Sequence, residues 1–247
     1  IARGAKARVL LFSHGGGKRG GTPLMHRDML AHLARAGFVV IAPFHGNTRR
    51  RLIVRPLHIR SALQAARKDP RFGDAADFDR LGIIGFSLGG AVSLILAGVE
   101  PDIAHLFDYC RDRRDDPRAC LGIDATKPAP ALPPIVPLHL KAVVLLDPFV
   151  ALFTTAKLKT LRIPVLQFRP ADSDLRAEGN ALVIARALPD RVTQHVVPGG
   201  HFVLVEPCPP SLANQAPDAC RDAEGVDRAK VHEMLRDRIT TFFKQHL

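Results

Sequence analysis

The stretch GFSLGG, residues 85–90, is the most informative part of the chain because of what stands on either side of it. The apolar run LGII precedes it and AVSLILAGV follows it, so a strand, a tight turn and a helix are predicted in that order. A serine between glycines at such a turn has two interpretations. Ser87 is either the reactive serine of a nucleophile elbow or a plain hydroxyl in a glycine-rich strand-to-helix turn.

The same alternation of strands and helices runs along most of the chain. Apolar runs of strand length stand at 7–13, 38–44, 80–86 and 141–147, and two more predicted strands, each with the loop that follows it, lie within 163–174 and 192–202. Stretches with helical spacing stand at 23–37, 55–69, 88–99, 178–189 and 226–247. Strands that are apolar throughout and alternate with helices predict an α/β fold, with a mostly parallel sheet covered by helices on both faces.

Residues from about 100 to 140 have a different texture. They contain two cysteines and the proline-dense run KPAPALPPIVP, and no segment there reads as a sheet strand. No repeat or linker interrupts the chain. We therefore expect a single domain, residues 1–247, with a small Pro-rich cap inserted at about 100–140.

A glycine-rich loop, FSHGGG, covers Phe12 to Gly17 at the end of the first predicted strand. In hydrolases with a nucleophile elbow, the loop at this place gives one backbone N–H to the oxyanion hole, and the residue after the nucleophile gives the other. We expect the N–H groups of Gly16 and Leu88 to form that hole. A tight turn also needs glycines, whereas GGGKRGGTP lacks the spacing of a phosphate-binding loop.

His201, in PGGHF, follows the last predicted strand near the C-terminus, where the base of such a hydrolase stands. Of the eleven histidines it is the one in that context. We expect His14 to shape the oxyanion loop rather than to act as the base. His45, His58 and His195 have plainer interpretations as structural or surface groups.

Three aspartates stand at or just beyond strand ends between the serine and the histidine: Asp147, Asp172 and Asp174. All three satisfy the chain order nucleophile, acid, base. Asp172 follows the strand immediately before the helix and strand that deliver His201, which is the commonest position for the acid. We therefore expect Asp172 to be the acid, with Asp147 as the main alternative and Asp174 as a further one.

The four cysteines form two local pairs, Cys110 with Cys120 and Cys208 with Cys220. Neither pair has CxxC spacing and no histidine stands at zinc-finger distance, so no metal site is expected. Local disulfides fit these Pro-, Asp- and Arg-rich segments better, and they imply an oxidising compartment. Four buried free thiols in a cytosolic protein are the alternative.

The net charge of +11 raises the question of an anionic partner such as nucleic acid. The basic residues, however, are mostly dispersed arginines interleaved with aspartates, and no nucleic-acid-binding motif accompanies them. No apolar run approaches the roughly 20 residues that a membrane-spanning helix needs. We expect neither a nucleic-acid partner nor a transmembrane segment, and the oligomeric state is not readable from the sequence.

Five stretches together resemble one enzyme family: LLFSHGGG, GFVVIAPFHGN, GFSLGG, IPVLQFRPADSD and VVPGGHFVLVEPC. The chain is similar, over nearly its whole length, to the bacterial dienelactone-hydrolase-like α/β-hydrolases, which are similar in turn to the platelet-activating-factor acetylhydrolases. The resemblance implies a serine esterase with a Ser-His-Asp triad that is often exported. Dienelactone hydrolase itself has a cysteine nucleophile, so dienelactone is not an implied substrate. In the acetylhydrolases the acid stands at the place matched here by Asp147.

From these residues and the resemblance we expect a serine carboxylic-ester hydrolase in which Ser87 attacks, His201 moves the proton and Asp172 orients His201. No cofactor is needed, and the substrate is a small-molecule or lipid ester. An acyltransferase with the same triad and a catalytically silent binding protein are the alternatives. The paired cysteines predict a periplasmic or secreted bacterial protein. The chain begins at Ile1, and the fold usually has an antiparallel pair of strands before the first strand seen here, so we expect an N-terminal piece to be missing.

Overall fold

A computed structural model of the chain describes residues 6–16, 21–46, 51–120, 122–209 and 217–247. Within these residues one sheet has the strand order β2-β1-β3-β4-β5-β6, and every neighbouring pair is parallel. The strands are β1 (Ala7–Ser13), β2 (Val39–Ile41), β3 (Ala76–Phe86), β4 (Ala142–Leu146), β5 (Val165–Asp172) and β6 (Val192–Gly200). The predicted parallel α/β sheet is confirmed.

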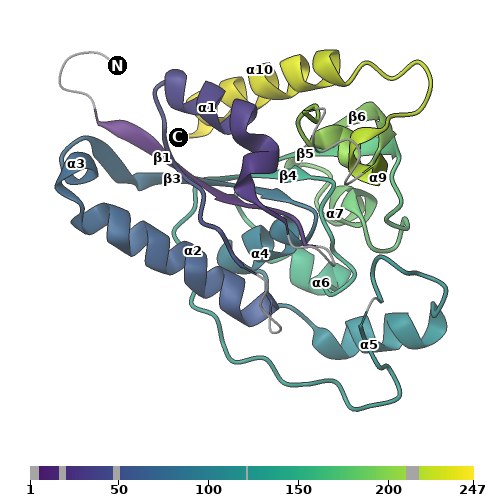
Figure 1. The fold of residues 1–247 in the computed structure, drawn as a ribbon. Helices are drawn as coiled ribbons and strands as arrows, with labels where there is room; N and C mark the ends of the chain where they lie inside the picture. The colour runs from purple at the N-terminus through teal and green to yellow at the C-terminus, as the bar shows by residue number, and fades with distance from the viewer. Residues whose placement is uncertain (1–5, 17–20, 47–50, 121, 210–216) are drawn as a thin grey trace.

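Helices cover both faces of this sheet (Figure 1). On one face lie α1 (Arg27–Arg35) and α10 (Arg228–His246). On the other lie α2 (Arg51–Lys68), α4 (Leu88–Leu96) and α7 (Ala181–Ala187). The other helical segments are η1 (Pro23–His26), α3 (Pro70–Gly73), α5 (Ile103–Asp112), α6 (Thr155–Leu158), η2 (His201–Leu204) and α9 (Pro217–Cys220).

The central strand β3 explains why the predicted strands are apolar throughout. Successive side chains of a strand point to opposite faces, and Ile83 packs with α2 and α4 while Ile84 packs with α1 and α10. Both side chains are fully buried. A strand with a core on each face needs an apolar residue at every position, and this is the pattern of parallel sheets.

The second predicted helix begins earlier than expected. The sequence pattern placed its start near Pro56, because proline suits a first helical turn. In the structure α2 begins at Arg51, and Pro56 lies inside it. Proline there removes one backbone hydrogen bond. The packing of Ile59 and Leu63 against the sheet holds the helix together all the same.

The segment between α4 and β4 contains α5, which a disulfide joins to the loop after it. From 122 to 141 the described chain contains neither helix nor strand. Partly buried apolar side chains nevertheless anchor this stretch to the core beneath α2 and α4, among them Leu132, Ile135 and Leu138. None of the helices in the described residues combines the length and the apolar character needed to cross a membrane.

Candidate active site

Ser87 lies at the turn between β3 and α4 in a backbone conformation that few non-glycine residues adopt. Its φ is 53° and its ψ is −119°. Three backbone hydrogen bonds hold the turn: Ser87 N donates to Leu146 O at 3.0 Å, and Ser87 O accepts from Gly90 N at 2.8 Å and Phe149 N at 3.0 Å. Strain held in place by surrounding bonds is typical of functional positions.

The glycines around this turn are required by close backbone contacts. A Cβ on Gly89 would lie 1.8 Å from Ser13 O, and a Cβ on Gly85 would lie 2.3 Å from Gly89 O. No side chain fits at such separations. The glycines therefore let β3, α4 and the end of β1 approach one another directly beneath Ser87.

His201 follows β6 as the first residue of η2. Its Nδ1 lies 2.7 Å from Asp147 Oδ2, and the side chains of His201 and Asp147 are 5 % and 0 % exposed. The imidazole stacks on the ring of Phe86, with centroids 4.7 Å apart, and Phe86 directly precedes Ser87. Because β3, β4 and β6 are parallel, their carboxyl ends bring the serine, the aspartate and the histidine to one edge of the sheet.

The expected pairing of Asp172 with His201 is not what the structure contains. Asp172 is the last residue of β5, pairs with Gly200 after a register shift, and is exposed. Asp174 forms an ion pair with Arg118 instead. The aspartate that reaches the imidazole is Asp147, the alternative acid, which directly follows β4.

Ser173 takes part in the site although no sequence pattern pointed to it. Its Oγ donates to Asp147 Oδ2 at 2.6 Å, so the same carboxylate oxygen is bonded by Ser173 and His201. Asp147 has a φ of 38°, and in the described chain it and Ser87 are the two non-glycine residues with positive φ. The strand end that the sequence favoured for the acid thus supplies a hydrogen bond to Asp147.

The glycine loop after β1 lies against the Ser87 turn. A Cβ on Gly15 would lie 2.8 Å from Phe86 and 3.4 Å from the Cβ of Ser87. The N–H of Gly16 is part of the peptide that joins Gly15 to Gly16. Leu88 is the first residue of α4, and the N–H groups of a first helical turn have no intrahelical acceptor. Of the two residues expected to form the oxyanion hole, Leu88 therefore directly follows Ser87 in the chain. Gly16 directly follows Gly15, which lies against the Ser87 turn.

Histidines behind this loop are held neutral. Burial, together with the nearby Arg55 guanidinium, lowers the pKa of His14 to about 4 and that of His45 to about 3. His14 Nδ1 donates to Gly15 O at 2.9 Å while its Nε2 accepts from His45 N at 3.2 Å, which a neutral ring with its proton on Nδ1 satisfies. His14 thus contacts the loop in the way that its expected role requires.

The loop that carries His201 is fastened to both helices on its face of the sheet. Glu206 accepts a hydrogen bond from Met29 N of α1 at 2.8 Å, and its other oxygen lies 3.2 Å from His232 Nδ1 of α10. His232 also donates from Nε2 to Val203 O at 2.9 Å. These contacts fix the backbone just after His201.

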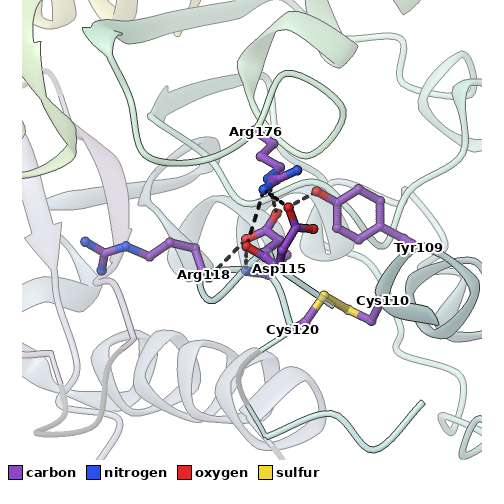
Figure 2. Close-up of a disulfide and its surroundings, with 8 residues drawn as sticks. Tyr109, Cys110, Asp115, Arg118, Cys120 and Arg176 are labelled. Carbon is purple, nitrogen blue, oxygen red and sulfur yellow. Dashed lines mark hydrogen bonds and ion pairs between the residues drawn. A yellow bond between two sulfur atoms is a disulfide. The ribbon is translucent and has the colours of Figure 1, made fainter. Parts of the chain in front are cut away.

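The loop closed by the Cys110–Cys120 disulfide reaches the same region (Figure 2). Inside it Asp116 accepts from Tyr109 Oη at 2.6 Å and from the backbone N–H of Arg118 at 3.0 Å. Figure 2 shows the Arg118 guanidinium pointing away from these groups. It lies 5.3 Å from the ring centroid of Phe202, the neighbour of His201. The second expected disulfide, Cys208–Cys220, is also present.

Removing the Cys110–Cys120 bridge is expected to lower the free energy of unfolding by about 3 kcal/mol, because the bridge restricts the unfolded chain. The two cysteines are 10 residues apart. A Cys110→Ser, Cys120→Ser variant tests this in a urea titration followed by circular dichroism. The matched Cys208→Ser, Cys220→Ser variant opens a loop of 12 residues and should lose a similar amount. An unchanged midpoint in the first variant would contradict the prediction.

Comparison with known proteins adds to this geometry. No protein-family model and no curated protein matches the chain. Among solved structures, an esterase of the pair described from Rhizomucor miehei is 17 % identical, with a TM-score of 0.56, over 98 % of this chain and 76 % of that one. Carboxyl esterase 2 from the mycorrhizal fungus Tuber melanosporum is also 17 % identical, with a TM-score of 0.59, over 98 % of this chain and 79 % of that one. The chain has the α/β-hydrolase fold.

The positions of the candidate residues agree with this fold. Ser87 stands at the turn after β3, Asp147 after β4 and His201 after β6, and all three lie at the carboxyl edge of the sheet, where ligands of open α/β sheets bind. The loop after β1 lies beside Ser87, where the fold provides one half of an oxyanion hole.

Proposed function

We propose that this protein is a serine carboxylic-ester hydrolase. The observation that carries the proposal is the buried His201–Asp147 pair beside a strained serine turn. The His201 ring stacks on Phe86, the residue that directly precedes Ser87. A strained serine, an imidazole and a carboxylate in this chain order are the parts of a nucleophilic triad. The similarity in fold to two fungal esterases supports the same class of reaction.

In the proposed mechanism Ser87 Oγ attacks the ester carbonyl carbon while His201 Nε2 accepts the serine proton. Asp147 holds His201 through Nδ1 and stabilises the imidazolium that forms, and Ser173 holds Asp147. The N–H groups of Gly16 and Leu88 receive the negative oxygen of the tetrahedral intermediate. His201 then gives its proton to the departing alcohol. In the second half of the reaction His201 takes a proton from water while the water oxygen attacks the acyl carbon, and His201 returns that proton to Ser87 Oγ as the acid leaves.

The substrate we propose is a small-molecule or lipid ester. The motifs quoted above support a place among the bacterial dienelactone-hydrolase-like enzymes, with serine as the nucleophile. An acyltransferase would use the same groups but exclude water, and adding alcohol acceptors during turnover separates the two. We also propose that residues 100–140 form a cap on a single domain, since Arg118 reaches the neighbour of His201.

A fluorophosphonate probe tests the proposal directly. Ser87 Oγ should displace fluoride from phosphorus and leave a covalent adduct, located by peptide mass spectrometry. The Ser87→Ala variant serves as the blank. A series of p-nitrophenyl esters of increasing chain length, measured alongside, assigns the acyl preference. A folded protein that stays unlabelled at Ser87 and hydrolyses none of these esters would rule the function out.

The two disulfides support export to an oxidising compartment. Both cysteine pairs are bridged, and such bridges are rare where glutathione keeps thiols reduced. We therefore propose a periplasmic or secreted location. Protein recovered from culture medium or periplasm with all four cysteines protected from alkylation supports this location, whereas free thiols in a cytosolic fraction contradict it.

A further inference from the structure

Arg55, on α2, is a buried cation placed directly behind the oxyanion loop. The residue is 1 % exposed. Its Nη1 donates to His14 O at 2.7 Å and to Gly15 O at 3.2 Å, and its Nη2 donates to Gly15 O at 3.2 Å. Burying a guanidinium is costly unless strong hydrogen bonds satisfy it. Because the partners here are backbone carbonyls of the glycine loop, these hydrogen bonds hold the loop backbone in one position.

The bonded carbonyl belongs to the same peptide unit as the N–H assigned to the oxyanion hole. Gly15 C=O and Gly16 N–H are the two ends of one peptide, and no described peptide bond is cis. In a trans peptide the C=O and N–H point in opposite directions within one plane. A group that fixes the direction of Gly15 O therefore fixes the direction of Gly16 N–H, away from Arg55.

Three donors converge on this one oxygen. Besides the two nitrogens of Arg55, His14 Nδ1 donates to Gly15 O at 2.9 Å. Gly21 closes the remaining side, because a Cβ there would lie 2.2 Å from Gly15 O. Glycines are free to rotate their peptide planes, and a loop of consecutive glycines needs such outside contacts to hold one orientation.

We infer that Arg55 is a positioning residue for the oxyanion hole: it orients the Gly15–Gly16 peptide and polarises its N–H through the bonded carbonyl. This inference rests on the proposed function. Hydrogen bonds to a carbonyl oxygen strengthen the donor at the other end of the same amide, and a nearby positive charge favours a developing oxyanion. The role is separate from the triad, since the Gly16 N–H that Arg55 orients receives the substrate oxygen and takes no part in moving the serine proton.

An ester and its thionoester, in which sulfur replaces the carbonyl oxygen, distinguish this role from a general structural one. Sulfur accepts hydrogen bonds weakly, so the thionoester gains little from an oxyanion hole. For Arg55→Met we expect kcat on the ester to fall by about 10- to 100-fold, less than the loss of a whole oxyanion donor. The ratio of ester to thionoester kcat should fall by the same factor, with KM nearly constant.

Two further variants make the experiment decisive. Arg55→Lys keeps the charge but not the fork of donors, so its ester-to-thionoester ratio should lie between those of Arg55→Met and the wild type. If Arg55→Met fails to fold, the ratio of Arg55→Lys should still lie below that of the wild type. Arg60→Met is the matched control: Arg60 is on the same helix and its Nη1 donates to Val136 O at 2.8 Å and Pro137 O at 3.4 Å, away from the glycine loop. This control should leave the ratio unchanged.

The outcomes separate the positioning role from the proposed function. An unchanged ester-to-thionoester ratio in the Arg55 variants, which means that any loss of kcat is equal on the two substrates, overturns the positioning role. The esterase function stands in that case. If the wild-type protein shows no hydrolysis that depends on Ser87, the proposed function fails, and the role of Arg55 fails with it. A ratio that falls in Arg55→Met and partly returns in Arg55→Lys supports the inference.

Discussion

Replacing Ser87 with alanine is expected to lower kcat on p-nitrophenyl butyrate by about 10⁶-fold. Without its Oγ no acyl-enzyme forms, and what remains is the stabilisation given by the oxyanion hole and by substrate binding. The loss should appear in kcat and kcat/KM alike, because the missing bond exists only along the reaction path. The fold should persist, since Ser87 is held through its backbone N–H and C=O.

Ser93, on the helix that follows Ser87, provides the control. Ser93 is fully buried in α4, and its Oγ donates to Gly89 O at 2.9 Å. Ser93→Ala removes a buried hydroxyl from α4 without removing the proposed nucleophile, so its kcat should stay within a few-fold of the wild type. Stopped assays at high enzyme concentration measure the residual rate of Ser87→Ala. Equal losses in the two variants would point to helix packing and against nucleophilic catalysis.

Replacing Asp147 with asparagine is expected to lower kcat by about 10⁴-fold. The amide has nearly the shape of the carboxylate, but its NH₂ donates to His201 Nδ1 and so favours the tautomer with the proton on Nε2. That tautomer is unable to accept the serine proton. The charge that stabilises the imidazolium is lost as well.

Asp172→Asn is the matched comparison, because the same chemical change is made at the residue that the sequence favoured. Asp172 is exposed, while the imidazole is bonded to Asp147, so kcat should change by no more than a few-fold. Circular dichroism and thermal melting are the checks that both variants are folded. A large loss in Asp172→Asn with a small one in Asp147→Asn would mean that the acid is Asp172 after all.

Much of the fold was readable from the sequence, because local physical constraints set it. Strands β1 and β4 and the second half of β3 are apolar on both faces since they are buried on both faces. The turn at Ser87 needs glycines since backbone atoms would overlap any side chain at positions 85 and 89. The two disulfides join cysteines only 10 and 12 residues apart, so their pairing is nearly a local property as well.

Which side chains meet at the site depends on packing between distant parts of the chain. Asp147, Asp172 and Asp174 all satisfy the chain order of a triad, and the sequence contains no measure of where each carboxylate points. The left-handed backbone of Asp147 and the register shift at the end of β5 turn Asp147 toward His201 and leave Asp172 in solvent.

The sheet, the strained serine turn and the position of His201 therefore follow from residues that are neighbours in the chain. The partners of these groups do not. Asp147 and Ser173 meet from two different strand ends, and Arg55 reaches the glycine loop from a position 40 residues beyond Gly15. Such contacts depend on strand order and helix placement, which no local pattern of residues encodes.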